Sequence, residues 1–136
     1  MERYETYRPL ADLPSQFSHG YVSETNDGVV VVTLYGEGSS RALNLRFKDV
    51  PAFRCVMEEC RLSGFEGIWD EPEKNVPCFI VHNSEWVTQF SEAELVHHRN
   101  PTHYAFLTAW REIEVLSTSP PEVSWQTAAS QETHPK

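Results

Sequence analysis

Hydrophobic and polar residues alternate in the first half of the chain as they do in paired β-strands. Residues 29–35 form a β-branched and aromatic run, and residues 41–48 alternate, with two leucines and a phenylalanine on one face. A period of two is typical of a half-buried strand. The glycines and serines of residues 36–40 predict a short loop between the two strands. We therefore expect a β-hairpin in the middle of an antiparallel sheet.

The segments on either side of this hairpin extend the predicted meander. Residues 17–24 are a strand candidate, and Asn26-Asp27-Gly28 after them is a strong hairpin signal. Phe53–Cys60 is ambiguous, because its apolar residues fit both a helical and a strand period. We favour a fourth strand of the meander there. Residues 1–16 are expected to be an irregular lead-in.

The second half of the chain predicts one helix among further strands. Residues 77–82 are a continuous apolar run, typical of a buried strand. Asn83 or Ser84 can cap a helix, and Trp86, Val87 and Phe90 then share an apolar face, which predicts a helix from about Ser84 to about Leu95. Two closing strands are expected at residues 103–108 and 111–117.

Together these elements predict one α+β domain over residues 1–117. Its architecture is a curved antiparallel β-sheet, built as a meander of hairpins, with one main helix packed on it. The length of 136 residues fits a single domain with a hydrophobic core. Residues 118–136 are rich in Pro, Ser and Thr, so we expect a largely disordered tail, with Pro120–Trp125 as the part that could dock.

The charge balance narrows the possible partners. The chain has 11 Lys and Arg against 20 Asp and Glu, a formal net charge of -9. This argues against nucleic acid, because phosphate binding requires Lys and Arg. An excess of negative charge either favours a basic partner or serves solubility alone.

Cysteine usage and hydropathy bear on location. The three cysteines are Cys55, Cys60 and Cys78, and the first residues contain no apolar stretch of the kind found in signal peptides. An odd number of cysteines without a leader favours reduced thiols. No apolar run approaches the roughly 20 residues that span a bilayer. We therefore expect a cytoplasmic protein that does not bind membranes.

Carboxylates concentrate between residues 49 and 73. An acidic surface can accelerate docking of a basic protein, although a solvated rim of loops would have the same composition. Trp110, at a predicted turn, could anchor such an interface, or it could pack in a small cluster under a loop. The candidate partner-binding residues are Glu58, Glu59, Glu66, Asp70, Glu71 and Trp110.

The candidate chemistry is less distinct. His97, His98 and His103 cluster in sequence, but adjacent histidines on a strand point in opposite directions, so a polar loop is favoured over a metal site. We expect no metal, no cofactor and no catalytic residue. The alternative is a small-ligand site or an enzyme that uses His82, His103 or Tyr104 near Cys78.

The order of segments resembles a group of small bacterial proteins. The resemblance rests on LNLRFKDVPAFRCVMEE, FIVHNSEWVTQFS and THYAFLTAWREIEVLSTSPPEV, and it covers Leu43 to Val123. Small acidic α+β proteins of this type are similar to immunity proteins of polymorphic toxin systems. The resemblance implies a toxin-like basic partner, by analogy of size, charge and organisation, and it assigns no catalytic residue.

Three hypotheses of function follow from the sequence. The first is a non-enzymatic binding protein, of the immunity type, that holds a basic partner through its acidic surface. The second is the small-ligand protein or enzyme described above. The third is a subunit of a homo-oligomer, for example a homodimer that pairs an edge strand across a two-fold axis.

Overall fold

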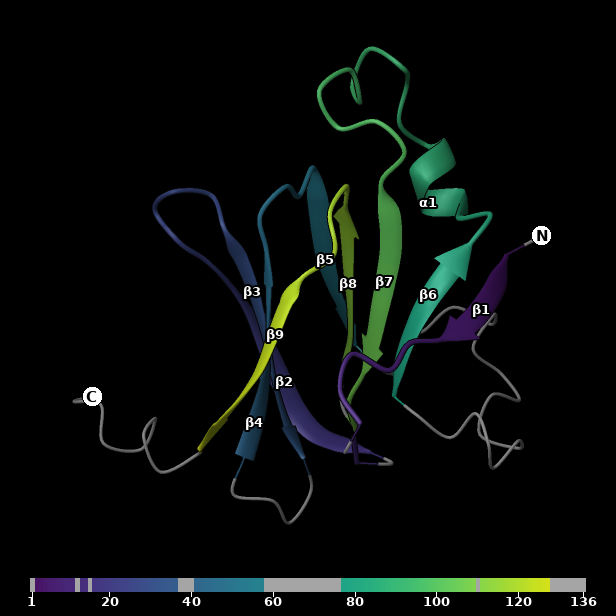
Figure 1. The fold of residues 1–136 in the computed structure, drawn as a ribbon. Helices are drawn as coiled ribbons and strands as arrows, with labels where there is room; N and C mark the ends of the chain where they lie inside the picture. The colour runs from purple at the N-terminus through teal and green to yellow at the C-terminus, as the bar shows by residue number, and fades with distance from the viewer. Residues whose placement is uncertain are drawn as a thin grey trace.

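The computed structural model describes residues 2–11, 13–14, 16–36, 41–57, 77–109 and 111–127. Over these residues the chain forms two antiparallel β-sheets that face one another, with one short helix at an end of the first sheet (Figure 1). The strands are β1 (Arg3–Thr6), β2 (Phe17–Glu24), β3 (Val30–Gly36), β4 (Arg41–Phe47), β5 (Ala52–Met57), β6 (Cys78–His82), β7 (Thr102–Leu107), β8 (Arg111–Ser117) and β9 (Glu122–Thr127), and the helix is α1 (Glu85–Thr88).

The first sheet has the order β1-β6-β7-β8-β5, and the second has the order β2-β3-β4-β9. All seven strand pairs are antiparallel. An isolated parallel bridge between Phe17 and Thr108 joins the two sheets near the ends of β2 and β7. The fold is therefore a β-sandwich, an architecture in which each strand presents alternate residues to the layer between the sheets.

The main core lies between the two sheets. The second sheet contributes apolar residues of β3 and β4, and the first sheet contributes residues of β6, β7 and β8. Phe47 of one sheet lies against Tyr104 and Phe106 of the other, with ring centroids 5.1 and 6.3 Å apart. Burial of these aromatic rings from opposite layers, together with the aliphatic side chains of the same core, holds the sheets together.

The outer face of the first sheet is buried as well. Phe79, Val81, Ala105 and Leu107 form a second cluster there, and all four are at most 4% exposed. Consequently β7 is buried on both faces, since Tyr104 and Phe106 alternate with Ala105 and Leu107 along it. This second, outer layer is where the polar groups of the candidate site lie.

The predicted central hairpin is confirmed. β3 and β4 pair from Val30 opposite Phe47 to Tyr35 opposite Ala42. β2 pairs with the other edge of β3. Gly28 in the predicted turn has φ +84°, a left-handed conformation that glycine adopts without the penalty of a side chain. The strands expected at residues 77–82, 103–108 and 111–117 are also present, as β6, β7 and β8.

The predicted α+β fold, one curved sheet with one main helix packed on it, is wrong. The described residues are mostly strand, and α1 covers only Glu85–Thr88 instead of the expected Ser84–Leu95. At the end of α1, the Thr88 side chain donates a hydrogen bond from Oγ1 to Glu85 O at 2.7 Å. Ser91 then begins a separate turn, in which its backbone N–H donates to Glu94 Oε1 and its Oγ accepts from Glu94 N. These local hydrogen bonds compete with continuation of the helix.

Three other expectations change. The Phe53 segment is a strand, as favoured, but β5 pairs with β8 in the first sheet and so does not continue the meander. The lead-in contains β1, which pairs with β6. The expected tail contains β9, which pairs with β4. The folded part therefore extends beyond residue 117 and includes most of Pro120–Trp125, the segment that was expected to be able to dock. Residues 128–136 of the predicted tail lie outside the described part of the chain.

In the described ranges there is no helix that is both long and apolar enough to cross a bilayer.

Candidate functional site

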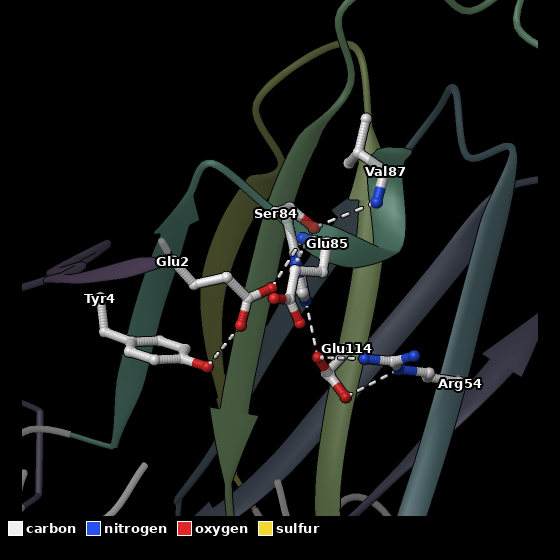
Figure 2. A network of polar contacts seen from close by, with 8 residues as sticks. Glu2, Tyr4, Arg54, Ser84, Glu85, Val87 and Glu114 are labelled. Carbon is white, nitrogen blue, oxygen red and sulfur yellow. Dashed lines mark hydrogen bonds and ion pairs between the residues drawn. The ribbon is translucent and has the colours of Figure 1, made fainter. Parts of the chain in front are cut away.

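A chain of buried polar side chains runs across the outer face of the first sheet. Ser84 Oγ lies 2.7 Å from His103 Nδ1, and His103 Nε2 lies 2.6 Å from Glu114 Oε1. Ser84 precedes α1, His103 is on β7 and Glu114 is on the adjacent strand β8 (Figure 2). Exposed fractions are 6% for Ser84, 3% for His103 and 1% for Glu114. We call these three residues the relay.

Arg54 of β5 pairs with Glu114, at the end of the relay that lies away from Ser84. Its Nε and Nη2 donate to the two carboxylate oxygens of Glu114 at 2.9 and 3.1 Å, a paired geometry that Arg54 reaches because it lies directly opposite Glu114 in the β5–β8 register. The guanidinium also lies 4.1 Å from the centre of the Trp86 ring. Trp86 meets the His103 ring edge-on, with centroids 5.2 Å apart. The imidazole is therefore contacted by Ser84, by Trp86 of α1 and by Glu114 of β8, and Arg54 in turn contacts Trp86 and Glu114.

The ionisation of Glu114 decides where the protons of the relay lie. Burial alone raises the pKa of Glu114, but hydrogen bonds and charges from His103 and Arg54 outweigh it and lower the pKa to about 2. Near neutral pH the carboxylate can only accept hydrogen bonds, so His103 Nε2 carries a hydrogen. In the neutral imidazole, Nδ1 is then an acceptor, and the Ser84 hydroxyl donates to it. This is the arrangement in which a histidine acts as a general base towards a serine.

The Ser84 end of the relay opens into a cavity. The cavity has a volume of about 640 Å³ and lies between the end of β6, α1 and the start of β7. The polar part of its lining consists of His82, Asn83, Ser84, Thr88, Asn100, Thr102 and His103. A concave site with a few convergent polar groups is the usual form of a small-molecule site.

The position of Ser84 is set by local structure on both sides. Its Oγ accepts a hydrogen bond from Val87 N at 3.1 Å and so caps α1. Glu2 then ties the helix to β1, since its carboxylate accepts from Glu85 N at 2.8 Å and from Tyr4 Oη at 2.9 Å (Figure 2). The first turn of α1 is thus held by the sheet edge as well as by its own cap.

The loop from α1 to β7 is held at a second point. His98 Nδ1 lies 2.7 Å from Asp49 Oδ1, and Thr118 Oγ1 donates to the other carboxylate oxygen of Asp49. The hydrogen bonds from Thr118 and then from His98 lower the pKa of Asp49. Asn100, two residues after His98, has φ +54° and lines the cavity. The contact at Asp49 therefore helps to place the cavity wall.

The residues of the predicted alternative site are brought together only in part. His82 and His103 line the same cavity, and His82 Nε2 lies 2.6 Å from Glu5 Oε1. Cys78 and Tyr104 instead belong to the core between the sheets, on the opposite face from His103. Burial raises the pKa of the Cys78 thiol, so it is not a thiolate at neutral pH. A site near His82 and His103 thus excludes Cys78.

The predicted partner-binding residues cannot be placed in the same way. Glu58, Glu59, Glu66, Asp70, Glu71 and Trp110 all lie outside the described residues. Within the part of the chain that is described, no group of three or more His, Cys, Asp and Glu side chains is arranged to hold a metal ion.

Ser84, Arg54 and Glu114 were not among the site residues predicted from the sequence. Ser84 has the signature of a helix cap, and Glu114 alternates with Ile113 and Val115 as a solvent-facing residue would. The available signal was a pair of opposite charges, Arg54 in one predicted strand and Glu114 in another. It becomes informative only once β5 is paired with β8, and the predicted meander placed β5 elsewhere.

Comparison of the chain with protein-family models, with curated proteins and with solved structures found no match.

Proposed function

We propose that the chain binds a small organic molecule in the cavity between β6, α1 and β7. The observation that carries this proposal is that the relay ends at the cavity wall, with the Ser84 hydroxyl oriented by His103. A buried ionised carboxylate such as Glu114 is costly unless it is paired, and such polarised groups concentrate at functional sites. The cavity volume suits a ligand of modest size.

The lining defines the chemistry of the ligand. Ser84, Thr88 and Asn100 present neutral hydrogen-bonding groups, while Val87 and Pro101 present apolar surface. A molecule with one carbonyl group and a compact apolar part satisfies both kinds of wall. Acetanilide, a neutral amide with a phenyl ring, is therefore a suitable probe, and benzoate tests whether a negative charge is accepted.

Filling the cavity with a larger side chain should remove binding. In Thr88→Trp, the indole occupies the cavity without replacing a relay residue, so the affinity for acetanilide should fall at least about tenfold, about 1.4 kcal/mol. Two-dimensional NMR of the amide groups measures this affinity, and in the unmodified protein the shifts should centre on residues 82–88 and 100–103.

The matched control is Gln89→Trp, which adds the same ring one residue further along, at an exposed position outside the cavity lining. This variant should bind acetanilide as the unmodified protein does. Equal losses in both variants, or amide shifts centred on the second sheet, would exclude the cavity as the site.

A second candidate function is the binding of a basic protein by an immunity-type mechanism in the cytoplasm. The net charge of -9 favours it, and so do the exposed apolar side chains of Phe53 and Met57 at the edge strand β5. The exposed thiol of Cys55, which forms no disulfide, suits a reducing compartment. A homodimer through a sheet edge would use the same kind of surface.

Charge reversal tests this second candidate. After a partner is identified by pull-down from the native host and purified, the double variants Glu58→Lys/Glu59→Lys and Asp70→Lys/Glu71→Lys should each weaken binding at least about tenfold and reduce its salt dependence. The control is Glu24→Lys/Glu92→Lys, which makes the same charge change at other exposed positions. Binding that is equally sensitive to all three double variants would reflect net charge instead of a local surface.

A further inference from the structure

We infer that Ser84 is the nucleophile of an acyl-transfer site, in which His103 is the general base and Glu114 positions His103. This inference rests on the proposed small-molecule site and names its substrate class as carboxylic esters. Three observations meet at Ser84: the hydrogen bond to His103, the ionised carboxylate behind His103, and the cavity that Ser84 and His103 help to line. A nucleophile, its base and an orienting group in hydrogen-bonding distance of one another make up the general pattern of serine activation.

The reaction balances with water as the only co-reactant. Ser84 Oγ attacks the carbonyl carbon of the ester while its proton passes to His103 Nδ1. The tetrahedral adduct then breaks the bond to the alcohol, which leaves with the proton from Nδ1, and an acyl-serine ester remains. Water attacks this ester with the same base, releases the carboxylic acid and restores the Ser84 hydroxyl. The sum is ester plus water giving acid plus alcohol.

Glu114 and Arg54 act on the base from behind. When His103 accepts the proton it becomes a cation, and the carboxylate of Glu114 at 2.6 Å stabilises that cation. Arg54 opposes this effect, because its own positive charge is paired with the same carboxylate. Among the described residues, the other ionisable side chains near His103 include Glu112 of β8, Tyr4 of β1 with its partner Glu2, Glu85 of α1, and His82 of β6 with its partner Glu5. Glu114 is thus a positioning residue, and its effect should be visible in the pH profile.

Capping of α1 would by itself account for a serine at position 84, without any role for His103. Ser91 provides a comparison. Ser91 also accepts a backbone N–H, that of Glu94, at 3.1 Å, and its own N–H donates to the Glu94 carboxylate. Ser91 is exposed, and its hydrogen bonds join it to Glu94. It is therefore a serine with the capping role and without the base, which makes it the matched control.

The experiment is covalent labelling with an alkyl fluorophosphonate, followed by peptide mass spectrometry. Labelling forms an Oγ–P bond at Ser84 and breaks the P–F bond, with fluoride as the leaving group and the serine proton passing through His103 to solvent. Ser84→Asn should abolish the label, because asparagine caps a helix as well as serine does but is no nucleophile. His103→Gln should slow labelling at least about 100-fold, and Ser91→Ala should leave it unchanged.

A second readout concerns Glu114. In Glu114→Gln the labelling rate should reach half of its maximum at a lower pH than in the unmodified protein, because the imidazolium loses its carboxylate partner. A purely structural role of Glu114 would change the amount of folded protein, measured by circular dichroism, without moving this midpoint. An unmoved midpoint in folded protein would therefore overturn the role assigned to Glu114.

Binding of acetanilide, measured in parallel, separates the two levels of the proposal. Acetanilide bound in the cavity with no fluorophosphonate label at pH 8 would overturn the nucleophile and leave the binding site standing. Neither binding nor label would overturn both. A label that maps to a residue other than Ser84, or one that persists in folded Ser84→Asn, would also overturn the inference. Hydrolysis of p-nitrophenyl acetate lost in the same variants would extend it from labelling to turnover.

Discussion

Replacing Glu114 by alanine should lower the free energy of unfolding by about 3–5 kcal/mol, the range observed when one partner of a buried ion pair is removed. Glu114 is 1% exposed and is the common partner of Arg54 and His103. Its removal leaves His103, itself 3% exposed, with a polar nitrogen that has lost its acceptor. Because 31% of the Arg54 side chain is exposed, its guanidinium can turn partly to solvent, and this favours the lower end of the range. Urea unfolding monitored by fluorescence measures the change.

The control for this prediction is an ion pair at the surface. Glu122 pairs with Lys48 at 2.8 Å, but both side chains are about two-thirds exposed. Glu122→Ala should therefore lower the free energy of unfolding far less than Glu114→Ala does. If Glu114→Ala and Glu122→Ala cost the same, the relay contributes no more than a solvent-exposed pair and our account of its burial is wrong.

Glu114→Ala should also change how the free energy of unfolding depends on pH. The folded-state pKa of Glu114 is lowered from 4.5 to about 2, so its contribution is complete above about pH 4.5 and is lost as the pH falls towards 2. The unmodified protein should lose stability through this window. Glu114→Ala should lose less, and the slope that remains should come from carboxylates such as Asp49, whose pKa is also lowered.

Local sequence pattern was sufficient to locate most strands. The hairpin of β3 and β4 was predictable because residues 29–35 are a β-branched and aromatic run, residues 41–48 alternate, and a glycine turn precedes them. β7 and β8 were predictable for another reason, namely a two-residue spacing of Tyr104 with Phe106 and of Ile113 with Val115. What this pattern does not contain is which strands pair over long distances. The meander was the simplest continuation, and β5 instead crosses to the other sheet.

The helix was overpredicted because an apolar face is necessary for a helix but does not fix its length. Trp86, Val87 and Phe90 have the right spacing, yet Thr88 and Ser91 form local hydrogen bonds that end the helix. The site was missed for a related reason. A serine cap, a histidine near the start of a strand and a strand glutamate each have an ordinary local explanation. Only the pairing of β7 with β8 and of β8 with β5 brings His103, Glu114 and Arg54 together.

Truncation of Phe106 and of its neighbour Leu107 should be costly in both cases, although the two side chains lie on opposite faces of β7. Phe106 is fully buried between the sheets, and Leu107 is 1% exposed in the outer cluster. We expect Phe106→Ala to lower the free energy of unfolding by about 3–5 kcal/mol and Leu107→Ala by about 2–5 kcal/mol, because each leaves a cavity in a packed layer. A sheet that is open to solvent on one side would show a large effect for only one of them.

The edge strand supplies the control for this comparison. Phe53 of β5 is 42% exposed, so Phe53→Ala removes a ring that is only partly buried and should cost about 1 kcal/mol or less. If Leu107→Ala costs as little as Phe53→Ala, the outer face of the first sheet is not a packed layer. The relay would then lie in a solvated environment, where Glu114 and Arg54 form a weak surface pair and a general base at His103 gains little from them. The stability of Leu107→Ala therefore tests the surroundings on which the chemistry at Ser84 depends.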